Sequence, residues 1–177
     1  MQLVPIILLI ICIVTVILYS LRQNNNILKF DKIFKNHFEL IEDAFSRFVF
    51  IGVPIIAAFS CVMLKCITAD IINNINTSLS VFIALQFSVV GVLCALPNGN
   101  SEYEDIKSKA FTEIIFESIL SILTLIISFL CLFIDLENVK PAMLWGPSFI
   151  LYTLIFSTIL NIFIVLKRMH FLFIKRK

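Results

Sequence analysis

Two acids, several hydroxyls and one thiol recur along a single apolar segment of this chain, and they are its clearest candidates for chemistry. Successive members are three or four residues apart, so on a helix they fall within a stripe about 80° wide. Because lipid cannot satisfy polar groups, such a face must turn toward other helices or toward water. The stripe consists of Glu113, Glu117, Ser121, Thr124, Ser128, Cys131 and Asp135.

Two interpretations of this stripe are open. In the first, copies of the helix surround a shared axis, and the hydroxyls line a narrow wet path whose acidic ends favour cations. In the second, the hydroxyls bond to their own backbone or to a neighbouring helix, which stabilises membrane helices modestly. The 17 residues of 118–134 are uncharged, so Glu113 and Glu117 can also lie at the cytosolic surface. Lys109 precedes Glu113 by four residues and can pair with it there.

The other reactive side chains do not form a catalytic or metal-binding set. His37 and His170 both belong to segments predicted to be cytosolic, and we expect His37 to be solvated or interfacial. His37 and Glu42 are five residues apart, about 140° round a helix, and do not face each other. The five cysteines have no C-x-x-C spacing and no partnered histidine, which indicates packing residues. The sequence also lacks the common hydrolase and phosphate-loop motifs, so we expect no enzyme, cofactor or metal site.

An integral membrane fold must position these residues. Hydrophobic residues make up 60% of the 177, charged residues only 15%, and the mean hydropathy is +1.03, unlike a soluble domain. Five apolar stretches are long enough to approach or exceed a hydrocarbon core of about 30 Å. We predict an all-α membrane protein with one integral domain over 1–177. Its spans lie near 3–21, 48–69, 79–96, 114–134 and 146–166.

Basic residues fall on alternate sides of these spans. Twelve lysines and arginines lie in the segments 22–47, 97–113 and 167–177, against only Lys65 and Lys140 on the other side. The positive-inside rule then predicts an outer N-terminus and a cytosolic C-terminus. The basic tail should also bind an anionic cytoplasmic leaflet. Its predicted lipid-surface anchors are Lys167, Arg168, Lys175, Arg176 and Lys177.

Turn and capping signals predict the boundaries of these spans. Proline and glycine interrupt or open helices, and a serine followed three residues later by glutamate can cap one. In chain order, the signals predict a kink at Gly52 and Pro54, an outer turn over 70–78, a helix from Ser101-x-x-Glu104 to 134, and a fifth helix opened by Gly146-Pro147.

Two faces are expected to make contacts. Residues 27–46 have helical periodicity and predict a cytosolic amphipathic helix, lying on the bilayer or docking a neighbouring helix or a partner. Its candidate partner face is Phe30, Phe34, Ile41 and Phe45. The third span carries small residues at intervals of three and four, which let membrane helices approach closely. This packing face is Ser80, Ala84, Ser88, Gly91 and Ala95.

These patterns favour a non-enzymatic, multi-pass membrane protein that self-assembles and affects membrane permeability, as a pore or effector. The alternative is a membrane scaffold, an immunity or defence-accessory subunit, that recruits a cytosolic partner. In gross plan the chain resembles the small multi-span subunits that bacteria use in these roles, and abundant Phe, Ile and Asn hint at an AT-rich bacterial genome. We expect it in the bacterial cytoplasmic membrane as a homo-oligomer, without direct nucleic acid binding.

Overall fold

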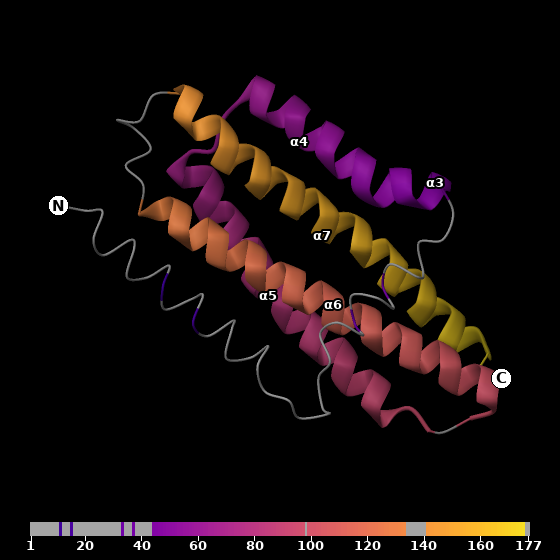
Figure 1. Cartoon of the computed structure of the whole chain (residues 1–177). Coiled ribbons are helices and arrows are strands. Elements are labelled where there is room, and N and C mark those ends of the chain that lie inside the picture. The colour runs from indigo at the N-terminus through magenta and orange to yellow at the C-terminus, as the bar shows by residue number, and fades with distance from the viewer. Residues whose placement is uncertain are drawn as a thin grey trace.

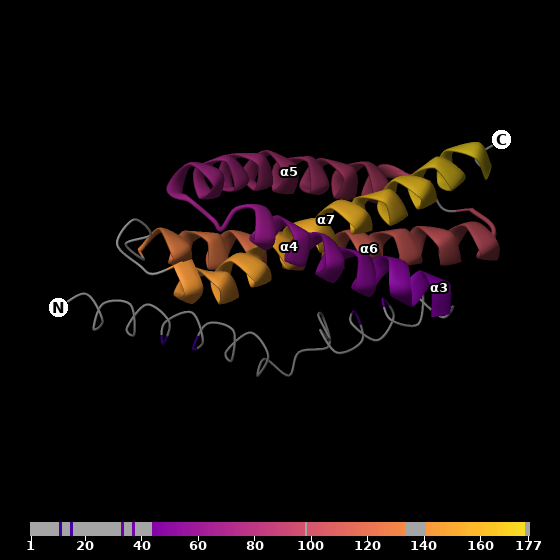
Figure 2. The same cartoon turned by 90° about the horizontal axis from the view of Figure 1, so that it is seen from above.

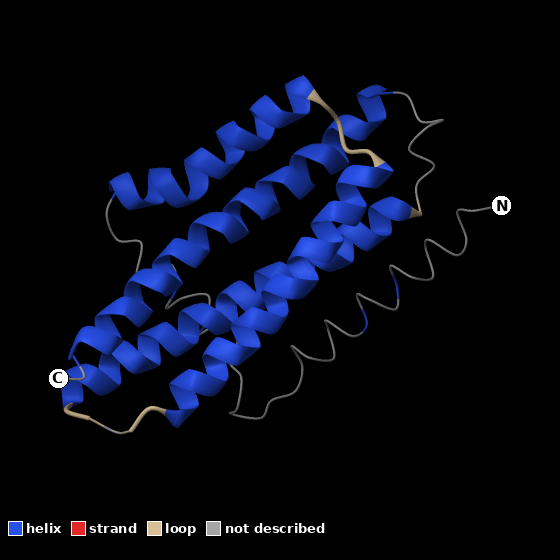
Figure 3. Ribbon diagram, turned by 180° about the vertical axis from the view of Figure 1, so that it is seen from behind, coloured by secondary structure: helices blue, strands red, loops and turns tan. Residues whose placement is uncertain are grey.

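The computed structural model describes Ile11, Thr15, Ile33, His37 and residues 44–97, 99–133 and 141–175. Within these residues the chain forms helices joined by short connections, without strands (Figure 3). The elements in chain order are α3 (Ala44–Arg47), η1 (Phe48–Gly52), α4 (Val53–Leu64), α5 (Ala69–Ala95), α6 (Ser101–Leu132) and α7 (Pro141–Lys175) (Figure 1).

Four helices of the described part are long and apolar enough to cross a membrane: Phe45–Leu64, Ala69–Ala95, Ser101–Leu132 and Met143–Leu172. Large apolar side chains such as Leu64 and Phe87 are exposed on the bundle, as expected where lipid covers it. The described part of the chain is therefore all-helical, and its four long apolar helices are consistent with an integral membrane protein. The predicted first span, 3–21, lies outside the described residues except for Ile11 and Thr15, which are helical. The orientation stays a prediction.

Helix α6 organises the bundle. It packs against both α5 and α7, and α4 packs on α7 (Figures 1 and 2). Apolar clusters lie at both ends of the helices. One contains Leu93, Leu96, Tyr103, Ala110, Ile114, Met169 and Leu172, and the other contains Ile67, Ile72, Cys131 and Leu151. Polar side chains are buried between these clusters.

The predicted turn over 70–78 is wrong, because these residues form the first turns of α5. The connection is instead residues 65–68. Thr68 caps the helix, because its side chain accepts a hydrogen bond from the Ile71 N–H. Asp70 lies in the first turn, where its negative charge interacts favourably with the positive end of the helix dipole. The hydroxyls of Thr77 and Ser80 donate to carbonyls four residues earlier, so these polar residues are compatible with a helix.

The start of the last helix also differs from the prediction. Helix α7 begins at Pro141, and Pro147 lies inside it rather than opening it. Proline is favoured at a first helical position because its missing N–H has no intrahelical partner there, so Pro141 supplies the start signal. The helix then continues to Lys175, beyond the predicted end of the span at 166.

The irregularity expected near Gly52 and Pro54 takes the form of a π-helical turn, Phe48–Gly52. There the Val53 N–H donates to the Phe48 carbonyl, five residues back. Proline cannot donate to the preceding turn, and a widened turn is one way a helix adjusts to this. The helical run therefore continues from α3 into α4.

Helix α6 begins where the sequence predicted, with its cap one residue earlier. Asn100, not Ser101, is the N-cap, and its Oδ1 accepts from the Tyr103 N–H at 2.9 Å. Glu104 Oε1 accepts from the Gly99 N–H at 2.9 Å. A Cβ at Gly99 would lie 2.7 Å from the Tyr103 ring, so this tight start needs glycine. The 32 residues of α6 extend for about 48 Å.

Candidate functional site

The polar stripe of α6 lies inside the bundle of a single chain. Its six described members, from Glu113 to Cys131, are at most 4% exposed. Because α6 packs against α5 and α7, the stripe faces those two helices. The stripe therefore packs against helices of its own chain. It does not form an outer face that several copies could turn toward a shared axis. Asp135, the seventh member, lies outside the described residues.

One end of the stripe carries a buried acid, a histidine and an arginine. Nδ1 of His37 is hydrogen-bonded to Glu113 Oε2 at 2.9 Å, and Nη1 of Arg168 lies 3.6 Å from Glu113 Oε1. The His37 ring also stacks on Phe116 with the centroids 3.7 Å apart. His37 is only 4% exposed. Our expectation of a solvated or interfacial histidine was wrong, because its partners are 76 and 79 residues away along the chain.

The sequence left open whether Glu113 pairs with Lys109, and in the structure the two are not paired. Glu113 and Glu117 are each 1% exposed. Lys109 pairs instead with Asp105 at 2.6 Å, in the favourable order with the acid four residues earlier. The backbone carbonyl of Lys109 accepts a hydrogen bond from Arg168 Nη1 at 3.1 Å. Arg168 is therefore turned toward α6 and Glu113, and the lipid-surface role predicted for it stays a prediction.

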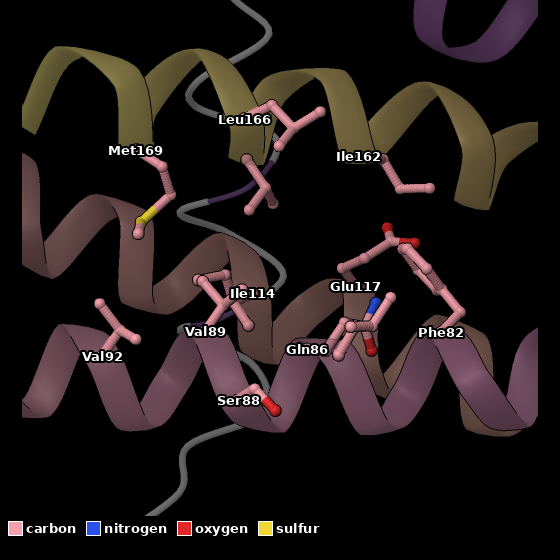
Figure 4. Close-up of a pocket in the computed structure, with 12 residues that line it drawn as sticks. Phe82, Gln86, Ser88, Val89, Val92, Ile114, Glu117, Ile162, Leu166 and Met169 are labelled. Atoms are coloured by element: carbon pink, nitrogen blue, oxygen red, sulfur yellow. The ribbon is translucent and has the colours of Figure 1, made fainter. Parts of the chain in front are cut away.

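Farther along the stripe, neither oxygen of the Glu117 carboxylate accepts a hydrogen bond. The side chain of Asn161 on α7 interacts with this carboxylate, although neither oxygen has a partner of full hydrogen-bond geometry. Gln86 of α5 donates from Nε2 to Ser121 Oγ at 3.4 Å, and its own Oε1 is unpartnered. Figure 4 shows Glu117 and Gln86 beside a cavity between α5 and α7.

Two hydroxyls follow along the stripe, those of Thr124 and Ser128. Thr124 Oγ1 donates to the Leu120 carbonyl of its own helix at 2.7 Å. Ser128 Oγ has no partner, nor has Thr158 Oγ1 on α7 or Asn76 Oδ1 on α5, and all three side chains are buried. We call the buried polar side chains of α5, α6 and α7 the polar column. Its members are Asn76, Gln86, Glu113, Glu117, Ser121, Thr124, Ser128, Ser148, Thr158 and Asn161.

The small-residue face of α5 is not used for packing within the chain. Ser80, Ala84, Ser88, Gly91 and Ala95 are all exposed. Of the candidate partner face, Phe45 is 78% exposed, whereas Phe30, Phe34 and Ile41 lie outside the described residues. Ile33 and His37, from the same predicted amphipathic helix, are buried. Part of this segment therefore docks on the bundle.

The basic tail is only partly described. Lys167 is exposed and Lys175 ends α7, and their role as lipid-surface anchors stays a prediction. Arg176 and Lys177 lie outside the described residues. In the described part of the chain, no three His, Cys, Asp or Glu residues form a metal-binding group. The cysteines described there, Cys61, Cys66, Cys94 and Cys131, are free thiols.

Sequence reasoning missed two members of this site. His37 could not be found, because its contacts come from a distant segment. Gln86 had a usable signal, since an amide within an otherwise apolar span is costly and usually has a partner. Compared with known protein families, curated proteins and solved structures, the chain matches none. Function must therefore be argued from the geometry alone.

Proposed function

We propose that this protein is a non-enzymatic, self-assembling membrane protein that makes the membrane permeable to protons or small cations. The path would run inside each bundle, along the polar column, rather than on an axis shared by copies. Within the described chain, this is the arrangement that the burial of the α6 stripe favours.

The observation that carries the proposal is the unused hydrogen-bonding capacity of the column. Seven oxygen atoms of its side chains are buried without a hydrogen bond, and they come from α5, α6 and α7; Glu113 Oε1 among them lies 3.6 Å from Arg168 Nη1. Buried polar groups normally have partners, and in a membrane their cost confines them to sites of function or of contact with water or ions. Acidic oxygens and hydroxyls suit cations and protons rather than anions. The unpartnered oxygens belong to Asn76, Gln86, Glu113, Glu117, Ser128 and Thr158.

Self-assembly is supported by the exposed small-residue face of α5. A Cβ at Gly91 would meet no atom within 4 Å, so this surface is open in the single chain. Small residues favour close approach of membrane helices, where lipid offers no hydrophobic gain. A second copy packed on this face would leave the polar column of each chain intact.

The test is ion flux into liposomes that contain the purified protein, followed with a potassium gradient and a pH-sensitive dye. Ser121→Leu should lower flux by at least about tenfold, because it places a bulky apolar side chain in the column beside Gln86. Ser118→Leu is the matched control. Ser118 lies about 60° from the edge of the stripe, and its hydroxyl donates to the Ile114 carbonyl of its own helix.

Because Ser121 is fully buried, leucine there can overpack the bundle. Thermal unfolding of both variants shows whether they keep their fold, and Glu117→Gln provides a variant of almost unchanged volume that should also reduce flux. Wild-type flux no greater than that of protein-free liposomes would overturn the proposal. So would wild-type flux in both Ser121→Leu and Glu117→Gln.

A further inference from the structure

A groove of about 620 Å³ lies along the C-terminal half of α7, where α6 begins and the η1 turn approaches. The end of α7 lies beside the beginning of α6 (Figure 1), and Arg168 Nη1 donates to the Lys109 carbonyl at 3.1 Å. The walls of the groove are largely apolar and include Phe50 of η1, Ile106 of α6 and Phe163 of α7. A volume of this size is typical of sites for small ligands.

Basic side chains also line this groove, and two of them are free to meet a ligand. Lys109 is paired with Asp105 at 2.6 Å, and Arg168 lies 3.6 Å from Glu113. Lys167 and His170 are exposed, and neither side chain pairs with an acid of the described residues. The groove therefore presents donors at its surface, with one lysine whose charge is not neutralised. The basic side chains of the lining are Lys109, Lys167, Arg168 and His170.

Three predicted membrane boundaries meet at this groove. Among the residues that line it, Phe50 is just past the predicted start of the second span, Glu113 immediately precedes the fourth span, and Lys167 immediately follows the fifth. Side chains that line one groove lie at similar depths, so the groove lies at the edge of the hydrocarbon core, where the lipid head groups begin. This depth does not depend on which way the protein is oriented in the membrane.

The chemistry of the groove selects one class of ligand. A cation would be repelled by Lys167 and Arg168. Free phosphate would gain nothing from the aromatic walls, and a zwitterionic lipid would bring its own ammonium group close to Lys167. An anionic phospholipid matches both parts of the groove, because a phosphate forms strong charge-assisted hydrogen bonds with basic side chains and an acyl chain can cover the apolar wall.

We propose that this groove binds one anionic phospholipid, with the phosphate between Lys167 and His170. These two residues are three apart on α7, and Phe163 is four residues before Lys167, so all three share one face of the helix. Phe163 lies one turn nearer the middle of the membrane, where an acyl chain would run. The anchoring predicted for the basic tail concerns the whole leaflet, whereas the groove holds a single molecule. The site goes beyond the proposed function, because lipid binding needs no ion flux.

The experiment counts the lipids bound to the full-length protein in detergent by native mass spectrometry, as phosphatidylglycerol is added. The wild type should bind about one molecule per chain tightly. Lys167→Gln should weaken this binding at least about fivefold, which is the contribution expected of one lysine near an anionic lipid. Lys65→Gln is the matched control. It removes the same charge from an exposed lysine outside the groove, directly after α4, and should bind as the wild type does.

Further arms locate the lipid and identify its head group. Ser46→Trp fills the groove without changing its charge and should abolish tight binding, whereas Ser60→Trp makes the same change at an exposed serine of α4 and should not. Phosphatidylcholine with the same acyl chains should bind at least about fivefold more weakly. Excess inorganic phosphate should not displace the lipid. Thermal unfolding establishes that each variant is folded, and if Ser46→Trp unfolds, Lys167→Gln and the two competing ligands decide.

The proposal is overturned if folded wild-type protein binds no phosphatidylglycerol, or if Lys167→Gln binds it as tightly as Lys65→Gln. Equal binding by folded Ser46→Trp and Ser60→Trp would also overturn it, since the lipid would then lie outside the groove. So would equal affinity for phosphatidylcholine, or displacement by inorganic phosphate. Flux in liposomes is measured separately, so absence of flux with intact lipid binding would reject the proposed function and leave this site standing.

Discussion

The pair formed by His37 and Glu113 offers the most direct test of the bundle interior. Nδ1 and Oε2 are 2.9 Å apart, and the two side chains are 5% and 1% exposed. We predict that His37→Phe lowers the free energy of unfolding. Phenylalanine keeps a flat ring to stack on Phe116, but the Glu113 carboxylate loses its hydrogen-bond donor. Arg168 Nη1, at 3.6 Å, is then its nearest charged partner.

The size of this effect follows from two opposing considerations. A hydrogen bond to a charged group contributes about 1.5–3 kcal/mol in proteins. Interhelix bonds in membranes average only about 0.6 kcal/mol and reach about 1.7, because the unfolded chain in the bilayer also finds partners. Because both side chains are almost inaccessible, we expect about 2 kcal/mol. For a chain of this length that corresponds to a fall of about 4–8 °C in Tm.

Thermal unfolding in detergent should be recorded for His37→Phe, Glu113→Leu and the double variant. The double variant should be more stable than the sum of the single changes predicts, by a coupling energy of about 1–2 kcal/mol, since no buried carboxylate is left unpaired. Lys109→Gln removes the exposed pair with Asp105 and should change stability by less than about 0.5 kcal/mol. A coupling energy near zero, with both single variants folded, would refute the proposed pairing.

Two predictions concern assembly and orientation. Gly91→Ile, at a site where a Cβ meets nothing within 4 Å, should weaken self-association at least about tenfold in analytical ultracentrifugation. Gly146→Ile, at an equally open site on α7, should not; equal effects would exclude the α5 face as the contact. An impermeant maleimide should label a variant that keeps Cys66 as its one cysteine in intact cells, but should label a variant whose one cysteine is Asn100→Cys only after permeabilisation. The opposite result would invert the predicted orientation.

Local signals in the sequence were sufficient for much of the fold. The helix beginning near residue 101 was predicted because caps and helix propensities act over a few residues, although Asn100 replaced Ser101 as the cap. The predicted turn over 70–78 failed for a related reason. Asparagine, serine and threonine favour turns in isolation, but the cap at Thr68 and the long α5 helix override that preference.

The residues that could form a site were partly visible in the same way. The polar stripe of α6 follows from helical periodicity, which the sequence displays directly. The residues that contact the stripe cannot be read from periodicity. Lys109 is four residues from Glu113 and looked like its partner, yet the charge of Glu113 is met by His37 and Arg168 from two other segments. Proximity along the chain was a poor guide to the partner of Glu113, because a buried side chain contacts whichever segments pack against its face of the helix.

The sequence by itself determined that this protein has helices long and apolar enough to cross a membrane and that one helix carries a polar face, because hydropathy and periodicity depend only on the order of residues. Tertiary structure alone decided that this face turns inward and that Glu117 is buried between α5, α6 and α7. Those outcomes depend on how α5 and α7 pack on α6, and contacts between helices far apart in sequence determine that packing.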